Sequence, residues 1–142
     1  NNFNKRIVKT PKVYFYDTGL AAFLLGIRTV KDLELHFAKG QLFENFVILE
    51  KIKQSLNTKN YDKYYFWRDA TGNEIDLLIE RNQQLLSIEI KSAKTIHSNF
   101  FKTLNYFKRI KPDTHSYLVY GGKEVQKRNN CTVLGFDDLN II

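Results

Sequence analysis

The sequence contains no methionine, a single cysteine and only two prolines among its 142 residues. The lone Cys131 excludes an intramolecular disulfide and is typical of a reducing compartment. No run of eighteen or more apolar residues occurs, and the N-terminus lacks the charged-then-apolar build of a signal peptide. We therefore expect a cytoplasmic protein without a membrane partner.

Two further absences concern the extent of the chain. Without a methionine, Asn1 is not a translation start, and the chain opens on a basic segment over residues 5–12. A phosphate-binding loop of the form Gly-x-x-x-x-Gly-Lys-Ser/Thr is also missing, so ATP binding through that motif is not expected here. We expect the chain to be a fragment of a longer polypeptide.

The composition is that of one globular domain, but its charge is unevenly distributed. Hydrophobic residues make up 43% and charged residues 26%, with a formal net charge of +7. Nine basic and only two acidic residues lie between Lys91 and Arg128, so this stretch carries the entire excess. It is either a surface that faces a polyanion or a set of ordinary solvated faces, and the sequence favours neither.

The apolar pattern predicts a mixed α/β domain. A largely buried helix is expected from about Lys39 to Leu56, followed by three strands with turns between them and a second helix. Two more short strands complete the order, which implies a mixed sheet with helices packed on its faces. A short helix with an Asp or Thr cap and a Gly stop is expected within residues 13–26. The later elements are expected at residues 64–69, 74–80, 85–91, 98–110, 117–120 and 131–134.

The second and third of these strands, over residues 74–80 and 85–91, carry charged residues among apolar ones. Side chains alternate along a strand, so Glu89 and Lys91 share one face while Ile88 and Ile90 face the core. If the two strands pair as a hairpin, Asp76 converges with Glu89 and Lys91. Two carboxylates and an ammonium can hold a divalent cation and polarise a phosphodiester.

Structural alternatives exist for these acidic residues. Asp76 could form a cross-strand ion pair with Lys91 or Arg68, and with Glu74 and Glu80 it could form an acidic strip facing solvent. The alternation of side chains places Asp76 on the solvent-facing side of the strand in these arrangements and in the metal-binding one alike. Glu44, expected in the first turn of the first long helix, is either a partner of the helix dipole or a functional group aimed at the sheet, and the dipole is favoured.

The order of Glu44, Asp76 and Glu89-Ile90-Lys91 along these elements resembles the PD-(D/E)XK nuclease superfamily, with Ile75 in place of the proline. The surrounding residues are similar to the C-terminal domain of a large group of bacterial and archaeal AAA-type ATPases, a domain labelled only as of unknown function. The matching segments are Gly40–Val47, Trp67–Asp69, Gly72–Asp76 and Ile88–Ser92.

The resemblance implies a restriction-endonuclease-like fold (αβββαβ) and a set of residue roles. Asp76 and Glu89 would ligate Mg²⁺ or Mn²⁺, with the Ile90 carbonyl as a further oxygen, and Glu44 would hold a metal-bound water or a second cation. Lys91 would orient the attacking water or steady the developing charge. The residues expected to contact nucleic-acid phosphates are Arg68, Lys94, Lys102, Lys108, Arg109 and Lys111.

Two functions fit this pattern. The first is a metal-dependent DNA phosphodiesterase domain appended to an AAA-type ATPase. The second is a catalytically inactive nuclease fold that binds nucleic acid or regulates the ATPase, since a fold does not settle an activity. In both, residues 1–38 form a connecting, partly helical segment from an upstream ATPase region, where any ATP would bind. Residues 39–142 form the nuclease-like domain, which could self-associate.

Overall fold

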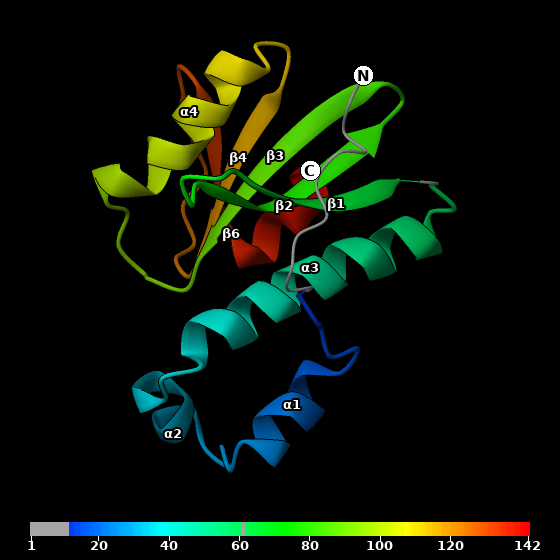
Figure 1. The fold of residues 1–142 in the computed structure, drawn as a ribbon. Helices are drawn as coiled ribbons and strands as arrows, with labels where there is room; N and C mark the ends of the chain where they lie inside the picture. The colour runs from blue at the N-terminus through cyan, green and yellow to red at the C-terminus, as the bar shows by residue number, and fades with distance from the viewer. Residues whose placement is uncertain (1–11, 61) are drawn as a thin grey trace.

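The computed structural model describes residues 12–60 and 62–142, which form a six-stranded mixed sheet with helices on both faces (Figure 1). Its strands are β1 (Lys63–Arg68), β2 (Glu74–Arg81), β3 (Gln84–Lys91), β4 (His115–Tyr120), β5 (Gln126–Arg128) and β6 (Cys131–Gly135). The predicted mixed α/β class is confirmed. Within these residues, no helix is both long and apolar enough to cross a bilayer.

The strand order is β1-β2-β3-β4-β6-β5. Strands β1, β2 and β3 form an antiparallel meander, β4 and β6 add in parallel, and β5 returns antiparallel at the edge. The parallel β3–β4 pair requires a crossover, because parallel neighbours cannot be joined by a tight turn. That crossover contains the helix expected over residues 98–110.

The helices lie in two layers around the sheet. They are α1 (Thr18–Leu24), α2 (Val30–Leu35), α3 (Lys39–Asn57) and α4 (Lys102–Ile110), with 3-10 turns at η2 (Ser98–Phe101) and η3 (Phe136–Ile141). Helix α3 covers one face of the sheet and α4 the other, while α1 and α2 pack on α3 away from the sheet (Figure 1). Asp17 caps α1 through the Leu20 N–H, and Gly26 follows it with φ 81°, as expected.

Two hydrophobic clusters, one on each face, hold these layers together. On the α3 face, Val47 and Ile48 pack with Ile88 and Ile90 of β3. On the α4 face, Leu104 and Phe107 pack with apolar residues of β2, β4 and β6. Ile88 and Ile90 therefore face the core as predicted, and Glu89 between them faces the α4 side.

Strand β2 carries a bulge that the sequence did not reveal. The β1–β2 register shifts between Tyr65, which pairs with Leu78, and Trp67, which pairs with Ile75. One β1 residue therefore opposes two residues of β2, Asp76 and Leu77, which defines a β-bulge. As a result, Ile75 and Leu78 lie in the same cluster although they are three residues apart.

The bulge overturns the expected exposure of Asp76. The sequence alternatives placed Asp76 in a solvent-facing strip with Glu74 and Glu80, but Asp76 is only 8% exposed. A continuous acidic strip requires uninterrupted alternation of side chains along β2, and the extra residue of the bulge interrupts that alternation.

Three elements of the described residues were not predicted individually: helix α2, the three-residue edge strand β5 and the turn η3.

Candidate active site

The candidate site lies where β2 and β3 separate. Their ladder ends at the pair Leu77 and Ile88, and beyond it the side chain of Asp76 spans the gap. Asp76 Oδ2 accepts a hydrogen bond from the Ile90 N–H at 2.8 Å. Lys91 Nζ lies 3.7 Å from Asp76 Oδ2 and forms a closer ion pair with Glu89 Oε1. The structure thus brings Asp76, Glu89 and Lys91 together.

These carboxylates are buried, and their proton affinities reflect it. Burial raises the pKa of Glu89 to about 7, and the neighbouring charge of Asp76 adds to the shift. Burial also raises the pKa of Asp76, against the lowering effect of Lys91. For Lys91, burial opposes protonation, but Asp76 and Glu89 raise its pKa above the ordinary lysine value. The group therefore holds a protonated lysine between two carboxyls of raised pKa.

One carboxylate oxygen of this site, Glu89 Oε2, has no hydrogen-bond donor among the described residues. This oxygen is fully enclosed. An unpaired buried carboxylate oxygen is costly, so such atoms usually mark a place for a ligand or an ion. In the same part of the chain, no three His, Cys, Asp or Glu side chains gather closely enough to form a metal cage. The arrangement offers two carboxylates rather than three.

Glu44 is placed differently from the sequence expectation. It is the sixth residue of α3, and the first turn of that helix has no acidic residue, so the favoured role as a dipole partner is wrong. Glu44 Oε1 instead accepts hydrogen bonds from Lys12 Nζ at 2.9 Å and from the Tyr14 hydroxyl at 3.1 Å. Lys12 also forms an ion pair with Glu74 at the start of β2. Glu44 thus approaches the sheet from the α3 side, where its charge adds to the raised pKa of Asp76.

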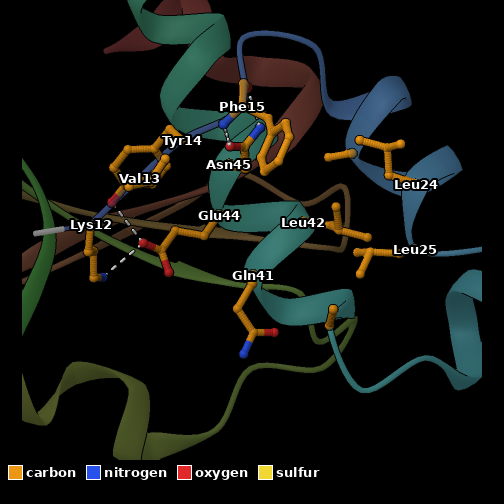
Figure 2. A pocket seen from close by; sticks show the side chains of 12 residues that line it. Lys12, Val13, Tyr14, Phe15, Leu24, Leu25, Gln41, Leu42, Glu44 and Asn45 are labelled. Atoms are coloured by element: carbon orange, nitrogen blue, oxygen red, sulfur yellow. Dashed lines mark hydrogen bonds and ion pairs between the residues drawn. The ribbon is translucent and has the colours of Figure 1, made fainter.

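A pocket of about 400 Å³ adjoins Glu44 between the N-terminal segment, α1 and α3. Figure 2 shows Lys12 and Glu44 at one end of it and the apolar side chains of Leu24 and Leu25 at the other. Asn45 holds this segment in place: its side-chain amide bonds both the N–H and the C=O of Phe15, at 2.7 and 2.9 Å.

The six basic residues expected to bind phosphates are spread over three places. Arg68 Nε lies 3.6 Å from Glu74 Oε2 and so borders the acidic group. Lys94 forms an ion pair with Glu34 near α2, at 3.1 Å. Helix α4, which covers the face of the sheet opposite α3, carries the remaining four on it or just after it: Lys102, Lys108, Arg109 and Lys111.

Sequence reasoning missed the two residues that hold Glu44. Lys12 belongs to the basic segment over residues 5–12, and Tyr14 precedes the short helix expected within residues 13–26. Neither has a motif around it, because a contact across 30 or 32 residues leaves no local periodicity. The sequence offers one local hint: Lys12 and Tyr14 are two residues apart, so their side chains share a face if this segment is extended.

Comparison with known proteins gives relatives of unassigned function. The uncharacterized proteins Mb2031c of Mycobacterium bovis and Rv2008c of Mycobacterium tuberculosis are each 36% identical to this chain over 94 residues. The match covers 66% of this chain and 20% of each relative, so the chain spans about a fifth of the length of these curated relatives.

Among solved structures, protein VC1899 from Vibrio cholerae superposes with a TM-score of 0.45 at 19% identity. That match covers 74% of this chain and 32% of the other. A family model matches residues 39–139, which begin at the first residue of α3 and include the whole sheet. The chain belongs to the DUF4143 family, a domain of unknown function.

Proposed function

We propose that this domain is a metal-dependent phosphodiesterase that acts on DNA, built on a restriction-endonuclease-like (PD-(D/E)XK) fold. The observation that carries the proposal is the meeting of Asp76, Glu89 and Lys91 at the point where β2 and β3 diverge. A buried pair of carboxyls with raised pKa beside a lysine is expensive to maintain in a fold, and such groups concentrate at functional sites.

The residues fit a hard divalent cation. Mg²⁺ is usually held by one or two carboxylates and keeps several waters, so Asp76 and Glu89 are a sufficient protein contribution. The unpartnered Glu89 Oε2 offers an oxygen ready for an ion, and the main-chain carbonyl of Ile90 would be a further ligand. Bound Mg²⁺ or Mn²⁺ would supply Lewis acidity toward a phosphodiester oxygen.

Lys91 performs the charge compensation in this proposal. Its ammonium remains protonated because Asp76 and Glu89 raise its pKa. Beside a bound phosphate, the ammonium would stabilise the negative charge that develops during cleavage. Glu44, on the α3 side of the same group, contributes a further carboxylate for a second cation or an ordered water.

DNA would be held by the basic residues around the site. Arg68 borders the acidic group and would bind a phosphate adjacent to the scissile bond. Lys94, Lys102, Lys108, Arg109 and Lys111 would contribute to a broader, salt-sensitive attraction to the backbone. We further propose that the domain belongs to a longer polypeptide with an AAA-type ATPase region, where ATP would bind.

A second function is favoured by one observation. In this structure each acidic group already has a lysine: Lys91 pairs with Asp76 and Glu89, and Lys12 pairs with Glu44 and Glu74. A site whose carboxylates are already paired with lysines could serve as a nucleic-acid-binding or docking module that regulates the ATPase without catalysis.

The test is cleavage of plasmid and single-stranded DNA with Mg²⁺ or Mn²⁺, comparing the wild-type chain with Asp76→Ala and Lys91→Ala. The proposal predicts metal-dependent nicking that falls at least about a hundredfold in both variants, a typical loss for removing a group that stabilises transition-state charge. A matched control is Lys53→Ala, a partly exposed lysine paired with Glu50 on α3. Equal nicking by all four proteins would mean a contaminant and would remove the enzymatic proposal.

DNA binding separates the two functions. An inactive binding module would retain an affinity that falls steeply with salt concentration, with no cleavage product at any metal concentration. Absence of both cleavage and salt-dependent binding would exclude the phosphodiesterase and the nucleic-acid-binding module, and would leave only the docking form of the second function.

A further inference from the structure

At the edge of the candidate site, the ammonium of Lys12 lies between two carboxylates, where a bound cation could otherwise lie. This ammonium lies 2.9 Å from Glu44 Oε1, forms an ion pair with Glu74 and sits 4.5 Å from the centre of the Phe66 ring. Two carboxylates and an aromatic face are the surroundings in which a protein binds a positive charge. Lys12 comes from outside residues 39–139, the part of the chain that the family model matches.

The segment that delivers Lys12 is fastened to α3. The Tyr14 hydroxyl donates to the same Glu44 oxygen that Lys12 contacts, and the Asn45 amide bonds both main-chain groups of Phe15 (Figure 2). Asn45 also donates to Thr18 Oγ1 at 2.8 Å, which ties the start of α1 to the same anchor. The lysine side chain is nevertheless 28% exposed, so solvent and ions reach it.

The charges around the two lysines do not cancel. When the edge of the site is included, four carboxyls stand against two ammonium groups: Glu44 and Glu74 pair with Lys12, and Asp76 and Glu89 pair with Lys91. The influence of Lys12 extends beyond its direct partners, because Glu74, with which it pairs, lies two residues before Asp76 on the same strand. A positive charge this near to Asp76 disfavours a divalent cation there, since like charges repel.

We infer that Lys12 is an internal cation that competes with a divalent cation for this site, so that displacement of residues 12–16 from α3 raises the affinity of the site for metal. The inference rests on the proposed function, because it assumes that Asp76 and Glu89 bind the metal. It adds a control element, because the N-terminal segment keeps Lys12 paired with Glu44 and Glu74 as long as that segment stays on α3.

The experiment is a calorimetric titration of Mn²⁺ alone into the full chain at fixed pH and ionic strength. Lys12→Met removes the ammonium and keeps most of the side chain, and Lys12→Gln serves as a second uncharged variant if Lys12→Met folds poorly. We expect both to bind Mn²⁺ about tenfold more tightly than wild type, since a nearby charge of like sign is removed. Lys12→Arg, which keeps the charge, should bind as wild type does.

Two controls make the failures distinguishable. Lys53→Met removes an equivalent positive charge farther along α3, about 14 Å from Glu44 by helical rise, and should leave the affinity unchanged. Glu89→Gln should abolish binding. If Glu89→Gln abolishes binding while the uncharged Lys12 variants match wild type, the inference is overturned and the proposed function stands. If wild type and all variants fail to bind Mn²⁺, both are overturned.

Discussion

Asp76 Oδ2 receives the Ile90 N–H at 2.8 Å, so a side chain on β2 completes the hydrogen bonding of β3 where the ladder has ended. The bond joins the bulge to the Glu89–Lys91 segment and fixes the spacing of the site. An aspartate can do this because its short side chain carries a hydrogen-bond acceptor that reaches the neighbouring strand. The same residue thus closes the sheet and lines the site.

Replacing Asp76 is therefore expected to cost stability as well as activity. Asp76→Ala leaves the buried Ile90 N–H without an acceptor and should lower the free energy of unfolding by about 1–3 kcal/mol. Asp76→Asn keeps an acceptor oxygen and should cost less. Urea denaturation followed by circular dichroism measures both.

The matched control is Glu80→Ala on the same strand, where the side chain is 41% exposed and its ion pair with Lys63 is 3.5 Å long. An exposed pair contributes at most about 1 kcal/mol. A loss for Asp76→Ala no larger than that for Glu80→Ala would contradict the structural role of the Asp76–Ile90 hydrogen bond.

The raised pKa of Glu89 makes stability depend on pH in a defined direction. Between the ordinary glutamate value of 4.5 and about 7, the folded state holds a proton that the unfolded state has lost. The free energy of unfolding should therefore fall as pH rises through this window, by up to about 3 kcal/mol. Asp76, whose pKa is also raised, adds to the fall.

Metal-free protein in a chelator, unfolded with urea at several pH values from 4.5 to 8, tests this prediction. Glu89→Gln removes the titrating group and should flatten most of the dependence. If the wild-type and Glu89→Gln curves run parallel, Glu89 ionises normally in the folded protein.

The β2–β3 hairpin turn holds two non-glycine residues in a backbone conformation that favours glycine. Asn82 and Gln83 both have positive φ, at 49° and 67°, as a two-residue type I′ turn requires. Asparagine tolerates this region, but glutamine does not, so Gln83→Gly should stabilise the fold by about 1 kcal/mol.

Thermal unfolding measures the effect, with Asn82→Gly as the comparison, for which a gain of only a few tenths of a kcal/mol is expected. Equal gains from the two substitutions would show that Gln83 carries no particular strain. A loss of stability for Gln83→Gly would mean that its side chain makes a contact worth more than the strain.

Gly121 allows the strand end after Lys91 to pack closely. Its N–H donates to the carbonyls of Lys91 and Ala93, both at 3.0 Å, and an added Cβ would lie 2.5 Å from the Ser92 carbonyl oxygen. Because backbone must shift to admit it, Gly121→Ala should cost about 1–3 kcal/mol and displace Lys91.

Gly40→Ala is the matched control, since a Cβ at that position in α3 meets nothing nearer than Ser92 Oγ at 4.0 Å. It should be neutral or stabilise by up to about 1 kcal/mol through helix propensity. Denaturant midpoints compare the two, and a Gly121→Ala protein as stable as wild type would show that the Ser92 segment yields easily.

Much of the fold was predictable because its signals are local. The strand at residues 85–91 alternates Ile88 and Ile90 with Glu89, and the structure keeps that alternation. Helix α3 was expected from Lys39 to Leu56 and spans Lys39–Asn57. Strand β5 was missed because three polar and basic residues, Gln126–Arg128, carry no apolar pattern; they pair only because β6 offers an edge.

The sequence by itself determined the mixed α/β class and the approach of Asp76, Glu89 and Lys91, since a hairpin and a two-residue period bring them together. Only the tertiary structure decided that Asp76 is buried, because the bulge depends on how β1 and both cores pack against β2. It also decided the partner of Glu44. Lys12 lies 32 residues away, and such a contact depends on how the chain closes in space rather than on any local pattern.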